Sequence, residues 1–368
     1  MSDSKSGKTV TNIEAPAPTE AIKTGRNLAG NKPSTAMGRF KQNLQFVRGR
    51  GALEITLVFA AIIIVFSIMS IADPKGFPFL DANNLSGVLT QSVPLMSILA
   101  IGVGILMIAG EFDLSLGFAL TFNAIVFIRI TEIAGPVAGI FAGLISGILI
   151  GLINGSIVVF TKIPSFIATL GMGFFWGGAS IFINGTSAAQ LPADLSSDGS
   201  WFELLFAHNF GFFRSQFVWL VLIGVIAFFF LQRHKYGNHI FAVGGNAAAA
   251  KAISISPNRV KLMAFGIEGL LVGFASILFV ARIPSVQPGG SATQDFTLFA
   301  VAAAVVGGTS LLGGRGTILG MIIGAALIEV IKNGLILGNA PGFYLQLFVG
   351  VTIVVAAIFN RFMEGKAS

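Results

Sequence analysis

Long apolar runs, separated by short polar stretches, follow one another along most of the chain after residue 51. A helix needs about 20 apolar residues to cross a bilayer, at a rise of about 1.5 Å per residue. Ten runs approach or exceed that length: 52–71, 85–109, 114–130, 133–160, 165–183, 216–231, 260–281, 296–312, 317–337 and 343–360. We therefore expect an all-α, polytopic integral membrane protein with about ten transmembrane helices. The runs 114–130 and 296–312 are short, and re-entrant segments there would leave eight full spans.

Composition supports a chain whose main partner is membrane lipid. Hydrophobic residues make up 54% of the 368 residues, charged residues only 11%, and the mean hydropathy is +0.84. Soluble domains carry about 25% charged residues. So few charges cannot cover a soluble surface of this size.

The distribution of basic residues predicts which loops face the cytoplasm. Residues 232–261 carry five Lys or Arg and no Asp or Glu. Basic residues near helix ends resist translocation across the membrane. If all ten runs cross, eighteen basic residues fall on the side of this stretch and four on the other. The basic stretch and both termini are therefore expected in the cytoplasm, in a multi-pass membrane protein.

The chain divides by composition into a tail and a membrane domain. Residues 1–50 are polar, with nine Lys or Arg and three acids, and are expected to be a disordered cytoplasmic tail. Residues 51–362 form the expected transmembrane domain, and 363–368 a short C-terminal tail. Within the domain we expect an external loop at 184–215 and a cytoplasmic loop at 232–260. Much of the net charge of +7 lies in the tail, so nucleic-acid binding is a poor explanation for it.

Catalytic chemistry finds no support in the sequence. The chain has no cysteine, and its three histidines have no metal-type spacing, so we expect no metal, no cofactor and no catalytic residue. The glycine-rich segment 306–317 lacks the Lys that a phosphate-binding P-loop requires. Active transport by this chain would therefore depend on a separate ATPase subunit.

Several polar residues fall at membrane depth and are candidates for lining a solute pathway. Glu268 has no basic residue three or four positions away, and a lone charge there costs roughly 3 kcal/mol or more. It must be protonated, paired across helices, or facing a polar cavity. For Asn123, Asn154 and Asn333, helix–helix hydrogen bonding is the default expectation and pathway lining the alternative.

Other polar and small residues predict structural roles. Glu329 and Lys332 lie at i and i+3 and are expected to neutralise each other. Asp113 precedes a helical run, which favours a helix N-cap over a ligand site. The run 133–160 places glycines at strict four-residue spacing, at 139, 143, 147, 151 and 155. This stripe predicts a tight helix–helix seam within the subunit, with a dimer seam as the minority alternative.

The basic stretch also contains a pattern suited to docking. Gly244 and Gly245 break the chain, Asn246 is an expected N-cap, and a short alanine-rich helix with Lys251 follows. Ser256-Pro257 can open the next helix, with Pro at its first position. A short helix presented in this way can dock into a groove on a soluble partner.

Motifs along residues 50–360 resemble the ribose-type permease family of bacterial ABC importers. They are Gly110…Asp113-Leu114-Ser115…Gly117, Pro164–Gly171, Tyr236-Gly237 through Gly244-Gly245-Asn246, Arg259-Val260-Lys261, and Gly307-Gly308-Thr309-Ser310-Leu311 through Thr317. The resemblance implies a homodimeric permease with two cytoplasmic ATP-binding subunits and a periplasmic solute-binding protein, importing a monosaccharide or a related small solute. It also implies that the coupling element lies at Gly244, Gly245, Asn246, Lys251 and Arg259. The alternative is an ion-coupled secondary transporter that uses Glu268.

Overall fold

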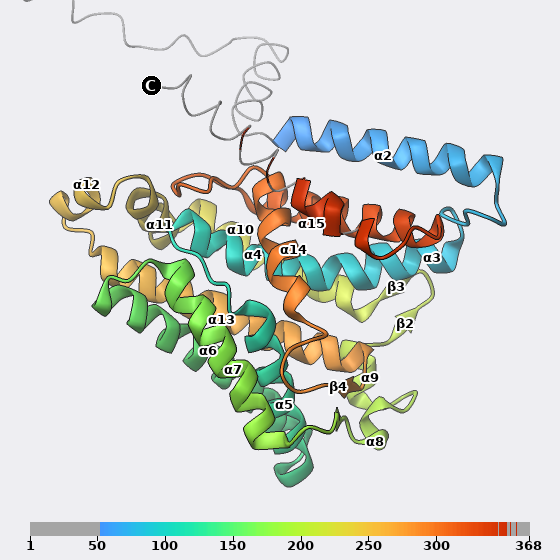
Figure 1. The fold of residues 1–368 in the computed structure, drawn as a ribbon, viewed down its shortest axis with the longest axis horizontal. Coiled ribbons are helices and arrows are strands. Elements are labelled where there is room, and N and C mark those ends of the chain that lie inside the picture. Colours follow the sequence, from blue (N-terminus) through green and yellow to red (C-terminus); the bar gives the residue numbers. More distant parts are fainter. Residues whose placement is uncertain (1–51, 345, 352–353, 355–357, 359–368) are drawn as a thin grey trace, which may run out of the picture. The chain divides into compact units, whose positions relative to one another are not determined.

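The computed structural model describes residues 52–344, 346–351, 354 and 358, all within one unit, Val47–Ser368. The expected tails, 1–50 and 363–368, lie outside the described residues. The described part is mostly helical (Figure 1). In chain order its elements are α2 (Ala52–Ala72), α3 (Ala82–Gly87), the π-helical turn η1 (Val88–Ser92), α4 (Val93–Ile108), α5 (Leu116–Ala134), α6 (Pro136–Thr161), α7 (Ser165–Asn184), β1 (Ala189–Gln190), α8 (Ala193–Ser196), α9 (Trp201–Phe206), β2 (Asn209–Phe210), β3 (Phe213–Arg214), α10 (Ser215–Arg233), α11 (Lys235–Gly245), α12 (Ala247–Ala252), α13 (Pro257–Arg282), β4 (Ser285–Val286), α14 (Gln294–Val306) and α15 (Ile318–Leu337).

Eight helices in the described residues are long and apolar enough to cross a membrane. They are α2, the continuous helix Ala82–Ile108 (α3, η1 and α4), α5, α6, α7, α10, α13 and α15. The expectation of an all-α polytopic protein is therefore confirmed. The short run at 114–130 is a full helix of 19 residues, whereas 296–312 yields only the 13-residue α14. The last run, 343–360, is only partly described.

Local sequence explains where several of these helices begin. Proline occupies the first turn of α6 and of α13, where its missing N–H costs nothing. Asp81 caps α3, its Oδ1 accepting from the backbone N–H groups of Asn83 and Asn84 at 2.9 and 3.1 Å. Thr317 caps α15 by accepting from Gly320 N–H at 3.1 Å. Asp113, in contrast, does not cap α5: Ser115 occupies the N-cap position, so that prediction was wrong.

The glycine stripe of α6 forms a seam inside the subunit, as predicted. A Cβ at Gly147 would overlap the Gly269 carbonyl oxygen of α13, and one at Gly151 would overlap the Phe265 carbonyl oxygen. Because four-residue spacing drifts around a 3.6-residue turn, Gly143 lies instead against Phe127 of α5 and Ile277 of α13. The two helix backbones can approach this closely only because the side chains are absent.

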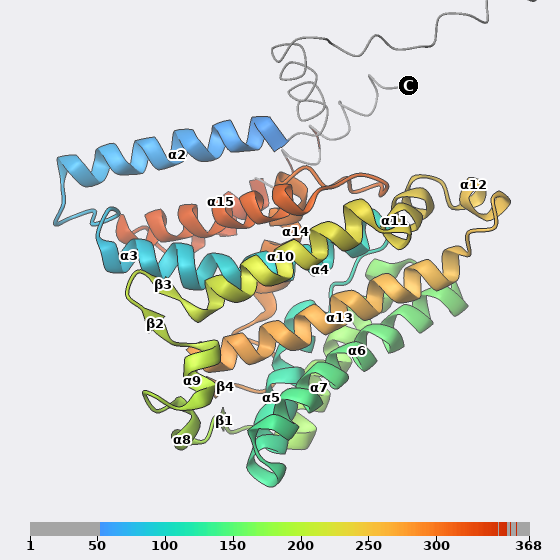
Figure 2. The same ribbon diagram turned by 180° about the vertical axis from the view of Figure 1, so that it is seen from behind.

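Connections that the sequence predicted on the same side of the membrane lie at the same end of the helices. Figures 1 and 2 show α11 and α12 at one end and α3, α8 and α9 at the other. The connection after α4 and the connection between α14 and α15 join α11 at the first end, where Gly110, Gly244 and Gly313 meet. We call this end the basic end and the other the opposite end. This grouping of the connections is the one expected if successive helices cross the membrane in alternating directions.

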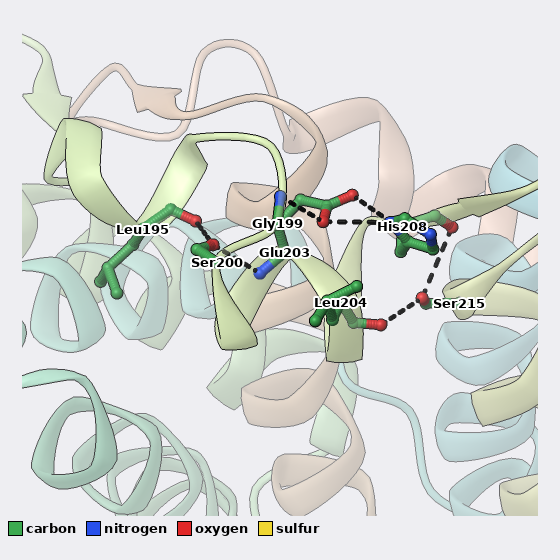
Figure 3. A network of polar contacts seen from close by, with 7 residues as sticks. All are labelled: Leu195, Gly199, Ser200, Glu203, Leu204, His208 and Ser215. Atoms are coloured by element: carbon green, nitrogen blue, oxygen red, sulfur yellow. Dashed lines mark hydrogen bonds and ion pairs between the residues drawn. The ribbon is translucent and has the colours of Figure 1, made fainter.

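The connection 184–215 is folded and packs at the opposite end. Its strand β1 pairs antiparallel with β4, and β2 pairs antiparallel with β3. Ser200 caps α9 by accepting from Glu203 N–H at 3.0 Å and donates to the Leu195 carbonyl at 2.6 Å (Figure 3). The Glu203 carboxylate contacts His208 Nδ1 at 2.9 Å, and Ser215 Oγ, at the start of α10, donates to the Leu204 carbonyl. These bonds give the connection a defined surface.

Candidate functional site

The alanine-rich helix predicted in the basic stretch is present and exposed. It is α12, and Asn246 caps it by accepting from Ala249 N–H at 2.9 Å. Lys251, on α12, and Arg259, in the first turn of α13, are both exposed. Ser256 lies at the N-cap position of α13, but its side chain makes no capping hydrogen bond. In both ribbon views α12 lies at the extremity of the basic end, accessible to a partner (Figures 1 and 2).

Glycines bring the base of α12 into backbone contact with two other connections. A Cβ at Gly244 would overlap the Ile108 carbonyl oxygen and lie 2.7 Å from Gly314 N. Gly314 N–H in turn donates to the same Ile108 carbonyl at 2.9 Å. Gly110 and Gly313 have φ of +86° and +84°, a region that side chains rarely adopt. We call Gly110, Gly244, Gly313 and Gly314 the glycine junction. In contrast, a Cβ at Gly245 would meet no described residue within 4 Å.

The segment between α4 and α5 has no regular secondary structure, and side chains of α7 accept hydrogen bonds from two of its backbone N–H groups. Phe112 N–H donates to Ser165 Oγ at 3.0 Å, and Leu114 N–H donates to Thr169 Oγ1 at 2.9 Å. Both hydroxyls belong to α7. Irregular backbone inside a membrane protein is tolerated only where protein groups or a cavity replace water. The Ser and Thr of the 164–171 motif thus have a physical role, since they hold the segment 109–115.

Helix α13 holds the same segment at two points on one face. Lys261 Nζ forms an ion pair with Glu111 Oε1 at 2.5 Å. Glu268, seven residues further along α13, interacts with the Asp113 carboxyl. Residues seven apart lie on the same helix face. One face of α13 therefore contacts Glu111 at the basic end and Asp113 deeper in the protein.

Asp113 is the centre of a buried polar network. Only 2% of the residue is exposed, and its Oδ1 accepts from Ser115 N–H at 2.6 Å. Its Oδ2 accepts from Asn154 Nδ2 at 3.1 Å, and Trp176 Nε1 donates to Asn154 Oδ1 at 3.2 Å. Burial raises the pKa of the Asp113 carboxyl, although hydrogen bonds from Ser115 and Asn154 oppose that shift. Two ionised carboxylates as close as those of Asp113 and Glu268 would repel, which distinguishes this pair from the ion pair on the same face of α13.

The four pathway candidates do not share one site. Glu268 and Asn154 belong to the Asp113 network, and Glu268 Oε1 has no hydrogen-bond partner in the described residues. Asn123 accepts from Ser146 Oγ at 2.6 Å, as expected for a helix–helix bond. Asn333 bonds Asn84 and faces a cavity. Whether any of the four lines a pathway stays a prediction.

The cavity beside Asn333 has a volume of about 390 Å³ and lies at the opposite end. Its lining includes Gln91, Arg282, Glu329 and Lys332, of which only the Glu329–Lys332 pair was singled out from sequence, for charge neutralisation. That ion pair is present, with 3.8 Å between Lys332 Nζ and Glu329 Oε1. In the sequence, the feature that could have indicated this cavity is the number of polar residues at the ends of several apolar runs. In the described residues, no group of three or more His, Cys, Asp or Glu could hold a metal ion.

A bundle of membrane-length helices with short connections at both ends is the architecture of a polytopic membrane protein. Residues 84–357 match the family described as "Branched-chain amino acid transport system / permease component". The chain is 36% identical to the probable ABC transporter permease protein YphD of Escherichia coli, over 88% of this chain and 94% of the relative. It is 35% identical to the ribose import permease protein RbsC of Bacillus subtilis (82% and 91%), and 29% identical to the fructose import permease protein FrcC of Rhizobium meliloti (83% and 86%). No solved structure matches the chain significantly.

The chain therefore belongs to the family of ABC transporter permeases that includes the ribose and fructose import permeases. It is a multi-pass protein of the bacterial inner membrane. Membership confirms the resemblance drawn from the sequence motifs, and it supports the importer over the ion-coupled transporter.

Proposed function

We propose that this chain is the membrane-spanning permease subunit of an ATP-driven importer for a monosaccharide or a related small polar solute. Two copies would form the permease with two cytoplasmic ATP-binding subunits, and a periplasmic solute-binding protein would deliver the cargo. Relatives named for ribose, fructose and L-arabinose support the substrate class. The observation that carries the proposal is α12, a capped, exposed helix whose base joins two other connections through backbone contacts.

In this proposal α12 is the coupling helix that docks on the ATP-binding subunit. Gly244, Gly245 and Asn246 present it, and exposed Lys251 and Arg259 offer charges to the partner. A displacement of α12 would move the α4–α5 segment and the α14–α15 connection as well. At the glycine junction their backbones are in direct contact, with no flexible side chain between them. The Lys261–Glu111 pair and the Asp113 network would carry the same displacement into the helices.

The distribution of basic residues supports a cytoplasmic basic end and a periplasmic opposite end. The folded connection 184–215 then faces the periplasm and is our candidate docking surface for the solute-binding protein. It exposes Trp201 at 42% and Phe210 at 59%, and it is held in shape by the Glu203–His208 contact (Figure 3).

Reconstitution tests the proposal. Purified chain in liposomes, supplied with its ATP-binding subunit and solute-binding protein, should accumulate labelled sugar only when ATP is hydrolysed. Chain alone should accumulate none on a proton or sodium gradient. Accumulation on an ion gradient without any ATPase, abolished by Glu268→Gln, would instead establish the ion-coupled alternative.

A further inference from the structure

A polar cavity opens where the ends of three membrane-length helices and of the shorter α14 meet. Its walls come from the helix Ala82–Ile108, the end of α13, the beginning of α14 and the second half of α15. The first of these helices is π-helical at Val88–Ser92, and Gln91 and Ser92 of that turn line the cavity. Single π-helical turns inside α-helices occur frequently at functional sites. At about 390 Å³ the cavity falls in the size range of small-molecule sites.

The cavity is lined by one acidic residue, Glu329, and two basic residues, Arg282 and Lys332, and the Glu329–Lys332 pair is not hydrogen-bonded. Glu329 Oε1 and Lys332 Nζ are 3.8 Å apart, too far for a hydrogen bond. Their side chains are 7% and 29% exposed, so Lys332 in particular stays accessible. Arg282 lies near enough to act on Glu329 electrostatically and donates to Ser92 Oγ at 3.1 Å. The Glu329 carboxylate and the Lys332 ammonium therefore keep hydrogen-bonding capacity that faces the cavity.

Uncharged amides line the neighbouring wall. Asn84 and Asn333 hydrogen-bond to each other in both directions, at 3.1 and 2.8 Å. Gln91 makes no side-chain hydrogen bond to the described residues, although it lines the cavity. An amide offers both donors and an acceptor, which matches a hydroxyl group. Phe279 and Phe296 supply an apolar surface, with ring centroids 5.9 Å apart in an edge-on arrangement.

We propose that this cavity binds the transported solute, and that it selects a neutral polyhydroxylated ring. One hydroxyl donates to Glu329 and accepts from Lys332, bridging the gap between them without adding a charge to the cavity. A second hydroxyl bonds Gln91, and the C–H face of the ring packs on Phe279 and Phe296. An anionic solute would compete with Glu329 for Lys332 and Arg282, and a solute with an ammonium group would compete with Lys332 for Glu329. This assignment of substrate class rests on the proposed import function.

Site-specific labelling tests the cavity without any partner subunit. The chain has no cysteine, so Gln91→Cys creates a single reactive thiol in the cavity. D-ribose, D-fructose and L-arabinose are the probes, with L-leucine as the competing class. A bound sugar should slow maleimide labelling of this thiol roughly tenfold at ten times its dissociation constant, by mass action. Lys75→Cys, exposed in the turn after α2, is the matched control and should label at an unchanged rate.

Each labelling outcome decides the proposal. Protection by a sugar and not by L-leucine supports it. Protection by L-leucine alone overturns the substrate class, and protection by neither overturns the site. If a sugar protects Gln91→Cys but the reconstituted system shows no ATP-driven uptake, the cavity stands and the import function fails.

Transport kinetics give a second test with a closely matched pair of variants. Glu329→Gln removes the carboxylate charge in the cavity, and we expect a roughly tenfold loss of uptake at low sugar concentration. Glu132→Gln removes the carboxylate of the Arg129–Glu132 pair, which has the same i, i+3 spacing but lies outside the cavity. It should transport as wild type. Equal uptake by both variants, with both correctly inserted, would overturn the role of Glu329.

Discussion

At the residue scale, two adjacent glycines at the base of α12 have very different surroundings. Gly244 has its Cβ direction blocked by the Ile108 carbonyl and Gly314. Gly245 also has its backbone against Gly314, but a Cβ on it would meet no described residue within 4 Å. The sequence pattern predicts the same role for both glycines, a break in the chain before the Asn246 N-cap. Their surroundings arise only when α4 and the α14–α15 connection arrive from distant parts of the chain. Small residues in a close backbone contact are far less replaceable than those in a simple turn.

The first prediction compares these two glycines. Gly244→Ala must separate three backbone segments, so we expect a loss of about 1–3 kcal/mol in stability, typical of overpacking, and uncoupling of ATP hydrolysis from uptake. Gly245→Ala should keep the stability and the coupling of the wild type. Thermal unfolding in detergent and coupled ATPase assays measure both effects. Similar behaviour of the two variants would refute the glycine junction as a transmission point.

A second residue-scale prediction concerns pH. Burial raises the pKa of Asp113 in the folded protein above its ordinary value of 3.8. The folded state then binds the proton more tightly than the unfolded state, so stability falls as pH rises from 3.8 through the raised folded pKa. Asp113→Asn cannot ionise but keeps an oxygen to accept from Ser115 N–H. Its unfolding temperature should fall less over that pH range than that of the wild type, and an unchanged slope would contradict the assignment.

At the element scale, α12 is short, exposed and capped by its own sequence. Its helical conformation and its N-cap could be predicted directly from the sequence, because Asn246 and the alanines interact within one helical turn. The contacts that hold the segment 109–115 in place could not be predicted from the sequence. It comes from Ser165 and Thr169 of α7 and from Lys261 and Glu268 of α13, which are far away in sequence. The Asp113 capping prediction failed for this reason, since the carboxyl turns toward α6 and α13.

The element-scale prediction is a crosslink. Lys251→Cys in the cysteine-free chain should crosslink to the co-expressed ATP-binding subunit through a short thiol–amine reagent, because α12 is expected to lie in the subunit's groove. Lys75→Cys, beyond the other end of the helices, should give none. A strong crosslink from another loop of the basic end, with none from position 251, would move the docking site.

At the scale of the whole molecule, α4, α5, α13, α14 and α15 connect the two ends of the bundle. The basic end has the glycine junction and the exposed α12, and the opposite end has the polar cavity and the folded 184–215 connection. Between them lies the Asp113 network, held by α13 along a face that begins near α12. The proposed docking site and the proposed solute site are thus separated along the helices.

The whole-molecule prediction is sidedness. In intact cells, a membrane-impermeant maleimide should label Lys75→Cys and leave Lys251→Cys unlabelled, because the excess of basic residues predicts that the basic end faces the cytoplasm. Permeabilised cells should label both, which controls for expression. Labelling of Lys251→Cys in intact cells would invert the topology and with it the proposed direction of transport.

The sequence by itself determined the class of protein, the approximate bounds of the helices, the glycine seam of α6 and the capped helix α12. These depend on local properties: run length against bilayer thickness, side-chain size at a fixed spacing, and capping within one turn. Tertiary structure alone decided which polar groups meet. It paired Lys261 with Glu111 and Glu268 with Asp113, and it gathered Gln91, Arg282 and Glu329 around one cavity. A polar side chain in an apolar run signals that it needs a partner, but only the packing of distant helices determines which one.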